Sequence, residues 1–159
     1  MIVLNEQTIK TDIDNWIKED TIRQQKEDYK KSMSYSVSQY LQSMDNWSHL
    51  ATIRAHFKLN SANANTLMDR ASKHPHIRKI FWVLESDINS YNHLHVLLDW
   101  VDMDTDMKAM RGRLNTAMGF KPNSGVVGYI DRIEQEKLRG ICNYTCKHIN
   151  TNSIYGFHL

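Results

Sequence analysis

The sequence of 159 residues contains only two cysteines, Cys142 and Cys146, which stand four positions apart in a stretch with helical periodicity. Two cysteines cannot form a disulfide framework, and no second pair is present to complete a zinc site with them. Scarce cysteine without an expected bridge indicates a reducing compartment. We therefore expect a cytoplasmic protein in which both thiols are small packing residues of a helix.

Long apolar segments are also lacking. No run of about 18 apolar residues is present, so no membrane-spanning helix is predicted. The first residues, Met1 to Glu6, show neither the basic start nor the apolar core of a secretory signal. With 2 prolines and 6 glycines there is no linker rich in either, and no repeat is visible. Because 41% of the residues are apolar, we expect one soluble domain without a membrane partner.

Neither sign of charge is in large excess, since 20 Lys and Arg stand against 18 Asp and Glu, giving a formal net charge of +2. A nearly neutral chain is not expected to coat a long nucleic acid. The bases are clustered, however, in residues 52–58, 70–79 and 108–121, whereas five acids and no base occur from Asp87 to Asp106. This pattern indicates a small surface that is locally basic.

Two helices are expected before residue 48. Residues 12–31 have helical spacing, with a polar second half. The apolar face of this helix contains Ile13, Trp16 and Ile17. A second helix follows, with apolar residues at helical spacing from Val37 to Trp47. We interpret residues 1–47 as an N-terminal helical extension of a domain that covers residues 48–159.

From residue 49 the pattern changes. Residues 51–59 alternate strictly between apolar and polar, which predicts a half-buried strand. The remaining expected elements are strands over residues 77–86, 91–100 and 125–133, helices that begin near Asn60 and Asp102, and a final helix over 134–148. The order β-α-β-β-α-β predicts an α+β fold with a ferredoxin-like or RRM-like antiparallel sheet. Two helices are expected on one face of the sheet, and the final helix is expected to cover the other.

His93 and His95 are separated by one residue in the third predicted strand of the sheet. Alternate residues of a strand share a face, so both imidazoles point the same way, as in metal sites. Alone, this pair is more typical of two neighbouring surface histidines. If the second and third strands form a hairpin about residues 87–90, an in-register pairing sets Glu85 opposite His93 on the same face. The expected metal ligands are His93, His95 and Glu85, with Asp87 as the alternative third ligand.

Tyr144 and Lys147 lie three residues apart on the final predicted helix, and so on nearly the same face. A tyrosine becomes a usable nucleophile when a metal or a cation favours its phenolate. A neighbouring cation also stabilises the negative charge of a phosphoryl group during its transfer. For Tyr144 taken alone, an aromatic ring that packs on the sheet beside a solvated lysine is the commoner arrangement.

Basic side chains that could contact phosphates occur in the first strand and in the helix after Asp102. The candidates for DNA binding are Arg54, His56, Lys58, Arg111 and Arg113. Ordinary solvated faces would contain the same residue types, so both interpretations remain open for these clusters.

Taken together, these motifs resemble the HUH endonuclease superfamily, and within it the replication initiator (Rep) proteins of small rolling-circle replicons. The segment from Tyr91 through His93 and His95 is similar to the histidine–hydrophobe–histidine motif of the family. The segment from Asn143 through Tyr144 and Lys147 is similar to its Tyr-x-x-Lys nucleophile motif. The first strand matches the opening motif of the family loosely. The resemblance covers residues 49–149.

The resemblance implies a single-stranded DNA endonuclease that can rejoin ends. In such enzymes a divalent ion, Mg²⁺ or Mn²⁺, polarises the scissile phosphate, and here His93, His95 and Glu85 would hold it. Tyr144 would attack the phosphate and form a 5′-phosphotyrosine link, while Lys147 would orient or neutralise the phosphate. The implied partners are single-stranded DNA at a replication origin, with or without a hairpin, and a host helicase and polymerase. The oligomeric state is left open as monomer or dimer.

Two other functions fit the same pattern. A small single-tyrosine transposase of the same superfamily would have the histidine pair, but its tyrosine is typically followed by Gln, so Lys147 favours a Rep. A non-catalytic RRM-like module that binds nucleic acid would have the same sheet. Such modules stack bases on aromatic residues of the sheet. The first predicted strand has no aromatic residue on its polar face, which argues against this second alternative.

Overall fold

The structure is a computed structural model that describes residues 6–44, 46–86, 92–150 and 152–159. Its helices are α1 (Glu6–Lys30), α2 (Met33–Ser43), α3 (Ser61–Ser72), α4 (Met107–Ala117) and α5 (Leu138–Cys146), with a 3-10 helix η1 (Gln135–Lys137) before α5. Its strands are β1 (His49–Ile53), β2 (Ile77–Ser86), β3 (Asn92–Trp100), β4 (Val127–Arg132) and β5 (Ile154–His158). The predicted order β-α-β-β-α-β is confirmed from β1 to β4.

The strands form one antiparallel sheet in the order β4-β1-β3-β2-β5. The sequence interpretation missed β5, which pairs with β2 at the edge of the sheet and changes the strand order from that of a four-stranded sheet. Gly156 in the middle of β5 obscures its strand pattern, since glycine weakens strands. A Cβ at this position would lie 2.7 Å from Trp82 Nε1, so the close approach of β5 to this indole requires a glycine.

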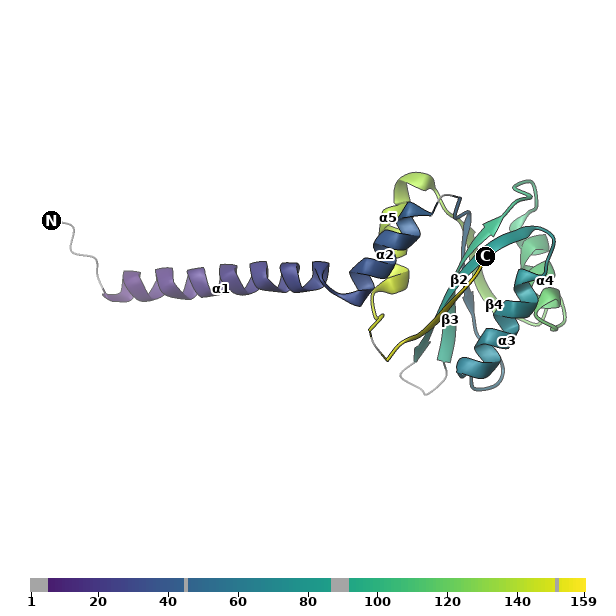
Figure 1. The fold of residues 1–159 in the computed structure, drawn as a ribbon, viewed down its shortest axis with the longest axis horizontal. Coiled ribbons are helices and arrows are strands. Elements are labelled where there is room, and N and C mark those ends of the chain that lie inside the picture. The colour runs from purple at the N-terminus through teal and green to yellow at the C-terminus, as the bar shows by residue number, and fades with distance from the viewer. Residues whose placement is uncertain (1–5, 45, 87–91, 151) are drawn as a thin grey trace.

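Helices cover both faces of the sheet (Figure 1). On one face α3 and α4 bury a core with Leu67, Met110 and Leu114 against residues of β1 to β4. On the other face α2 and α5 bury a second core that contains Leu41, Trp47, Phe81, Val83, Leu97, Ile133, Cys142, Cys146 and Ile149. The prediction that the final helix covers the second face is therefore confirmed, and α2 shares that face with it.

Side-chain caps begin the two helices between the strands. Asn60 accepts from the backbone N–H of Asn63, whose own side chain accepts from the N–H of Asn60, so the two form a reciprocal capping box before α3. Asp106 caps α4 by accepting from the N–H of Ala109. The sequence interpretation placed this cap at Asp102, which was wrong because residues 102–105 form a turn ahead of the helix.

The first strand is shorter than predicted. It ends at Ile53, and residues 54–60 leave the sheet although their apolar and polar residues still alternate. Ile53 is the last residue of β1 that pairs with β3 and β4, where it lies opposite Leu94 and Val127, and one further backbone bond runs from Arg54 N–H to the carbonyl of Val126. Phe57, predicted to face the core, is 43% exposed and stacks on Phe120 instead.

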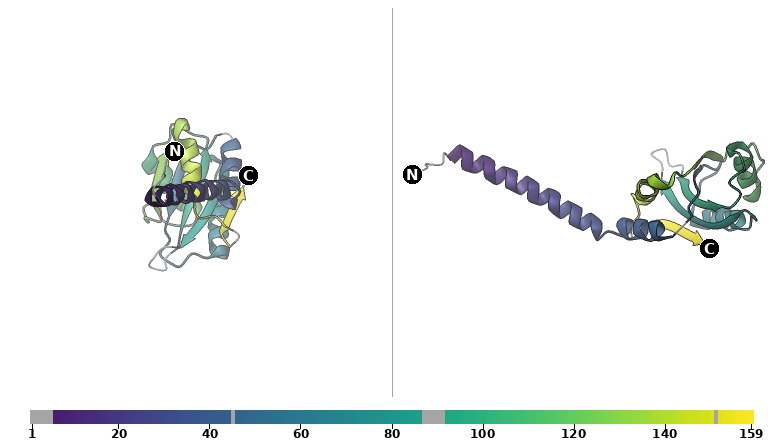
Figure 2. Two further views of the ribbon diagram at one scale, coloured as in Figure 1. Left: turned by 90° about the vertical axis from the view of Figure 1, so that its left-hand side faces the viewer. Right: turned by 90° about the horizontal axis from the view of Figure 1, so that it is seen from above.

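Helix α1 extends away from the body of the molecule, as Figure 1 and the right-hand view of Figure 2 show. Its apolar residues Ile13, Trp16 and Ile17 are each more than half exposed. The predicted apolar face of α1 is therefore exposed to solvent in the structure. None of the helices in the part of the chain that the structure describes has the length and apolar character needed to cross a bilayer.

The two thiols are free and buried, as predicted. Burial raises the pKa of Cys142 to about 11 and that of Cys146 to about 12. Thiols that stay protonated are poor nucleophiles and poor metal ligands. Both cysteines therefore act as packing residues between α5 and the sheet.

A pH dependence of stability follows from His49, which is fully buried at the start of β1. Burial, and next the charge of Arg132, lower its pKa from 6.5 to about 4. Between pH 6.5 and 4 the unfolded chain binds a proton at His49 and the folded chain does not. The free energy of unfolding therefore falls as the pH is lowered from 6.5 toward 4. We expect the unfolding free energy to fall by about 3 kcal/mol more than in His49→Gln between pH 7.5 and 4, measured by urea titration. Equal losses in both proteins would contradict this assignment.

Candidate metal centre and nucleophile

The hairpin of β2 and β3 positions three potential metal ligands. Glu85 pairs with His93, and His95 pairs with Val83, so the predicted register is confirmed. Alternate residues share a face, and therefore Glu85, His93 and His95 all face the layer of α2 and α5. The proposed turn at residues 87–90 and the alternative ligand Asp87 lie outside the described residues.

The three ligand atoms converge closely. Glu85 Oε2 lies 3.1 Å from His95 Nε2 and 3.4 Å from His93 Nε2, and the two Nε2 atoms are 3.2 Å apart. All the ligand atoms of this group lie within 4.8 Å of one another. Neighbouring ligands of an octahedral ion with bonds of about 2.1 Å stand about 3 Å apart, so the spacing suits a small divalent cation. We call this group the Glu–His–His triad.

His95 is held in the neutral form that binds metals. The pKa of His95 is lowered, first by burial and then by the charges of His93 and Lys147, although the carboxylate of Glu85 acts to raise it. A neutral imidazole is the form that binds a metal. Thr52 Oγ1 lies 3.4 Å from His95 Nδ1 on the other side of the ring, which orients Nε2 toward the triad.

One carboxylate oxygen of the triad indicates whether a cation fits there. Glu85 Oε1 is buried and has no hydrogen-bond partner among the residues that the structure describes. A buried carboxylate oxygen without a partner costs free energy unless a ligand or an ion satisfies it. Two imidazoles and a carboxylate that keeps this unsatisfied oxygen form a donor set that fits a divalent cation.

Tyr144 on α5 lies directly against the triad. Its ring packs edge-on against His95, with ring centroids 5.4 Å apart, and its side chain is 47% exposed. Lys147 caps the end of α5, and its Nζ lies 4.1 Å from the centroid of the Tyr144 ring. The structure thus brings an accessible phenol and a cation to the candidate metal ligands, and it confirms that Tyr144 and Lys147 lie side by side, as their helical spacing predicts.

Helix α2 holds α5 in this position. Ser34 Oγ donates to the carbonyl of Cys146 at 2.6 Å, and Ser38 Oγ donates to the Asn143 side chain at 2.6 Å. These bonds flank Tyr144 in the sequence and join residues more than 100 positions apart. The N-terminal region therefore contributes to the orientation of the candidate nucleophile.

A polar hollow of about 490 Å³ adjoins the triad beside Glu85. Its walls include Lys58, Asn60, Asn92, Asn150 and His148. The structure therefore brings Lys58 to the same hollow as a triad residue. The sequence interpretation did not single out His148, whose only signal is that it directly follows Lys147.

Two other predicted DNA-binding residues, Arg54 and His56, lie beyond the end of β1. Arg54 directly follows β1, and its backbone N–H donates to the carbonyl of Val126. His56 lies in the loop after it, where Nε2 is 3.2 Å from the carbonyl of Ser124. Both side chains are exposed, at the end of the sheet where β1 and β4 meet.

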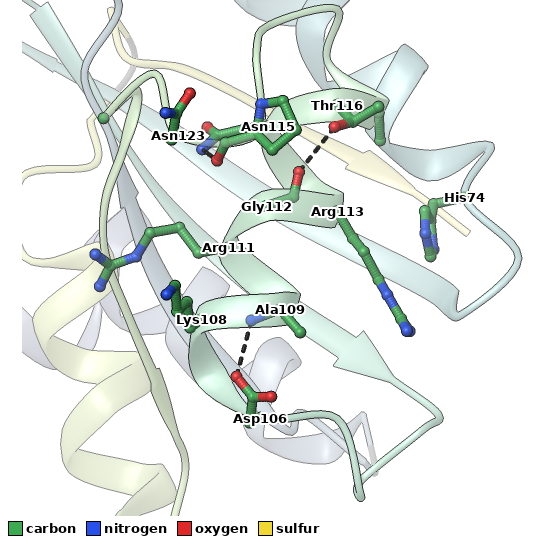
Figure 3. Close-up of a pocket in the computed structure, with 13 residues that line it drawn as sticks. His74, Asp106, Lys108, Ala109, Arg111, Gly112, Arg113, Asn115, Thr116 and Asn123 are labelled. Carbon is green, nitrogen blue, oxygen red and sulfur yellow. Dashed lines mark hydrogen bonds between the residues drawn. The ribbon is translucent and has the colours of Figure 1, made fainter.

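Arg111 and Arg113 do not join the triad. They lie on α4, which packs on the opposite face of the sheet. There they line a hollow of about 870 Å³ with Lys108 and His74 (Figure 3), and Arg113 Nη1 lies 3.4 Å from His76 Nδ1. Arg113 is also 3.9 Å from the carboxylate of Asp102. Any nucleic acid held by these residues would lie on a surface separate from the triad.

Comparisons with protein-family models, with curated proteins and with solved structures found no match to this chain.

Proposed function

We propose that the chain is a metal-dependent, single-stranded DNA endonuclease of the HUH type, which acts in rolling-circle replication. The observation that carries this proposal is the contact of Tyr144 with His95, a member of the Glu–His–His triad. A buried ligand set beside an exposed phenol and a lysine supplies the groups that a nicking and rejoining reaction needs. The order β4-β1-β3-β2 supports a ferredoxin-like arrangement of these four strands.

Each residue has a distinct role in the proposed reaction. Glu85, His93 and His95 would hold Mn²⁺ or Mg²⁺, which supplies Lewis-acid activation of the scissile phosphate when bound. The phenolic oxygen of Tyr144 forms a bond to phosphorus while the bond from phosphorus to the 3′ oxygen breaks. The phenol loses its proton, and the departing oxygen gains one and becomes a free 3′-hydroxyl. The reverse step rejoins the strand, because the phosphotyrosine conserves the energy of the broken bond.

Lys147 contributes charge and position. Its Nζ lies over the ring of Tyr144, where a cation stabilises a developing phenolate and the negative charge of the phosphoryl group. Lys58 faces the polar hollow beside Glu85 and is available to a phosphate there. These cations are local, which agrees with a chain of net charge +2 that binds a short segment of DNA.

The direct test incubates the protein with a mixed-sequence pool of single-stranded DNA and Mn²⁺, followed by electrophoresis in SDS. The proposal predicts a protein–DNA adduct that survives SDS and that does not form when EDTA is present. Absence of an adduct with every strand tested would overturn the proposed activity. A stable complex without an adduct would support the second candidate, an RRM-like binding module, which the exposed Tyr129 on β4 favours.

A further inference from the structure

The sheet presents an aromatic side chain beside the triad that no motif singles out. Tyr129 of β4 pairs with Thr52 of β1, and Thr52 pairs with His95 of β3. Directly paired residues share a face, so Tyr129 lies in the same cross-strand row as a triad residue. Adjacent strands are about 4.8 Å apart, which places the backbone of Tyr129 about 10 Å from that of His95.

This part of the face is open. The core under α2 and α5 is built mainly on β2, β3 and β5, through residues such as Phe81, Leu97 and Phe157, and it reaches the β1 and β4 side only at Leu50 and Ile133. At the opposite edge, Tyr129 is 48% exposed and Asp131 is also exposed. The face of β4 beside the triad is therefore accessible to a ligand.

A bulge shapes the surface around Tyr129. Thr52 pairs with Tyr129 and Ile53 pairs with Val127, so Gly128 is left without an opposing residue. Bulges turn side chains and are frequent beside active sites. Gly128 is exposed and has no side chain, which leaves the strand next to the Tyr129 ring uncovered.

The ring of Tyr129 is held in place. Its hydroxyl donates to Asp131 Oδ2 at 3.2 Å, which leans the ring along the strand. Partial burial, and next the charge of Asp131, raise the pKa of Tyr129, so the phenol stays neutral. A neutral, oriented and half-exposed ring suits the stacking of a nucleobase, for which aromatic side chains on exposed sheets are the usual partners.

We propose that Tyr129 is a stacking platform for an unpaired base next to the scissile phosphate. This inference depends on the proposed function for the identity of the ligand. The bound DNA strand would then run along the row from Tyr129 through Thr52 to His95, with the unpaired base on β4 and the phosphate at the triad. The platform makes the enzyme prefer single strands, because both faces of a base inside a duplex are already stacked on its neighbours.

The test measures binding by fluorescence anisotropy, with every protein carrying Tyr144→Phe so that no cleavage occurs. Two probes are used, a labelled single-stranded DNA of mixed sequence and a strand of the same length built from abasic sites. We expect Tyr129→Ala to weaken binding of the normal strand about tenfold or more, and to leave binding of the abasic strand within about twofold. Tyr129→Phe keeps the ring and is expected to bind the normal strand within about twofold of the parent.

Tyr29→Ala is the matched control, since Tyr29 is 44% exposed but lies on α1, away from the sheet. Equal effects of Tyr129→Ala on both strands, or no effect on either, would overturn the platform. A failure of the platform alone leaves the adduct of the unsubstituted protein intact. A failure of the nicking activity alone leaves base-dependent binding that requires Tyr129. The two proposals can therefore fail separately.

Discussion

Substitution of Tyr144 by Phe is expected to abolish the SDS-resistant adduct with single-stranded DNA, a loss of about a thousandfold or more in the rate of its formation. The substitution removes the phenolic oxygen and keeps the ring that packs on His95. The fold and DNA binding should therefore persist. Adduct formation is measured by SDS electrophoresis in the presence of Mn²⁺, and binding is measured by anisotropy without it.

The control for this experiment is Tyr40→Phe. Tyr40 is 52% exposed on α2, and its ring packs edge-on against Phe157, so it resembles Tyr144 in exposure and in its aromatic contact. We expect Tyr40→Phe to form the adduct at the normal rate. If the adduct forms equally well in Tyr144→Phe, another side chain is the nucleophile and the assignment is wrong.

Substitution of His95 by Ala is expected to weaken Mn²⁺ binding by about a hundredfold or more and to reduce cleavage accordingly. His95 supplies the triad atom that lies 3.1 Å from Glu85 and 3.2 Å from His93 Nε2. At 100 times its dissociation constant, a ligand stabilises the folded state by about 2.7 kcal/mol. Mn²⁺ should therefore raise the melting temperature of the native protein by about 5–10 °C and that of His95→Ala hardly at all.

Glu85→Gln provides a second variant of nearly the same shape, and we expect it to lose most of the same thermal shift. His74→Ala is the control, because its imidazole stacks on Trp100 away from the triad. Melting temperatures in EDTA identify any variant that is unfolded from the start. A full Mn²⁺ shift in both His95→Ala and Glu85→Gln would rule out the triad as the metal site.

The triad could be predicted because its geometry follows from short-range rules. One residue between His93 and His95 places both on one face of a strand. The register that pairs Glu85 with His93 was predicted because a shift by one residue would place the carboxylate in the opposite core. An unpaired charge there is costly. The proximity of Tyr144 and Lys147 follows from helical spacing in the same way.

The missed features depend on which strands are neighbours. Residues 54–59 alternate like a strand but leave the sheet after Ile53, which is the last residue of β1 to pair with β3 and β4. Tyr129 reaches the row of His95 only through the pairing of β4 with β1. The separation of Arg111 from the triad likewise depends on the face that α4 covers. Local patterns in a sequence do not contain these long-range choices.

The most direct test of the central claim is to identify the residue that becomes covalently attached to DNA. The adduct formed with Mn²⁺ is digested with nuclease and protease, and the remaining nucleotide is located on the peptides by mass spectrometry. We predict a nucleotide linked through a 5′-phosphate to Tyr144, on the peptide that also contains Cys142 and Cys146. A nucleotide on another side chain, or unmodified Tyr144 in a sample with abundant adduct, would contradict the account.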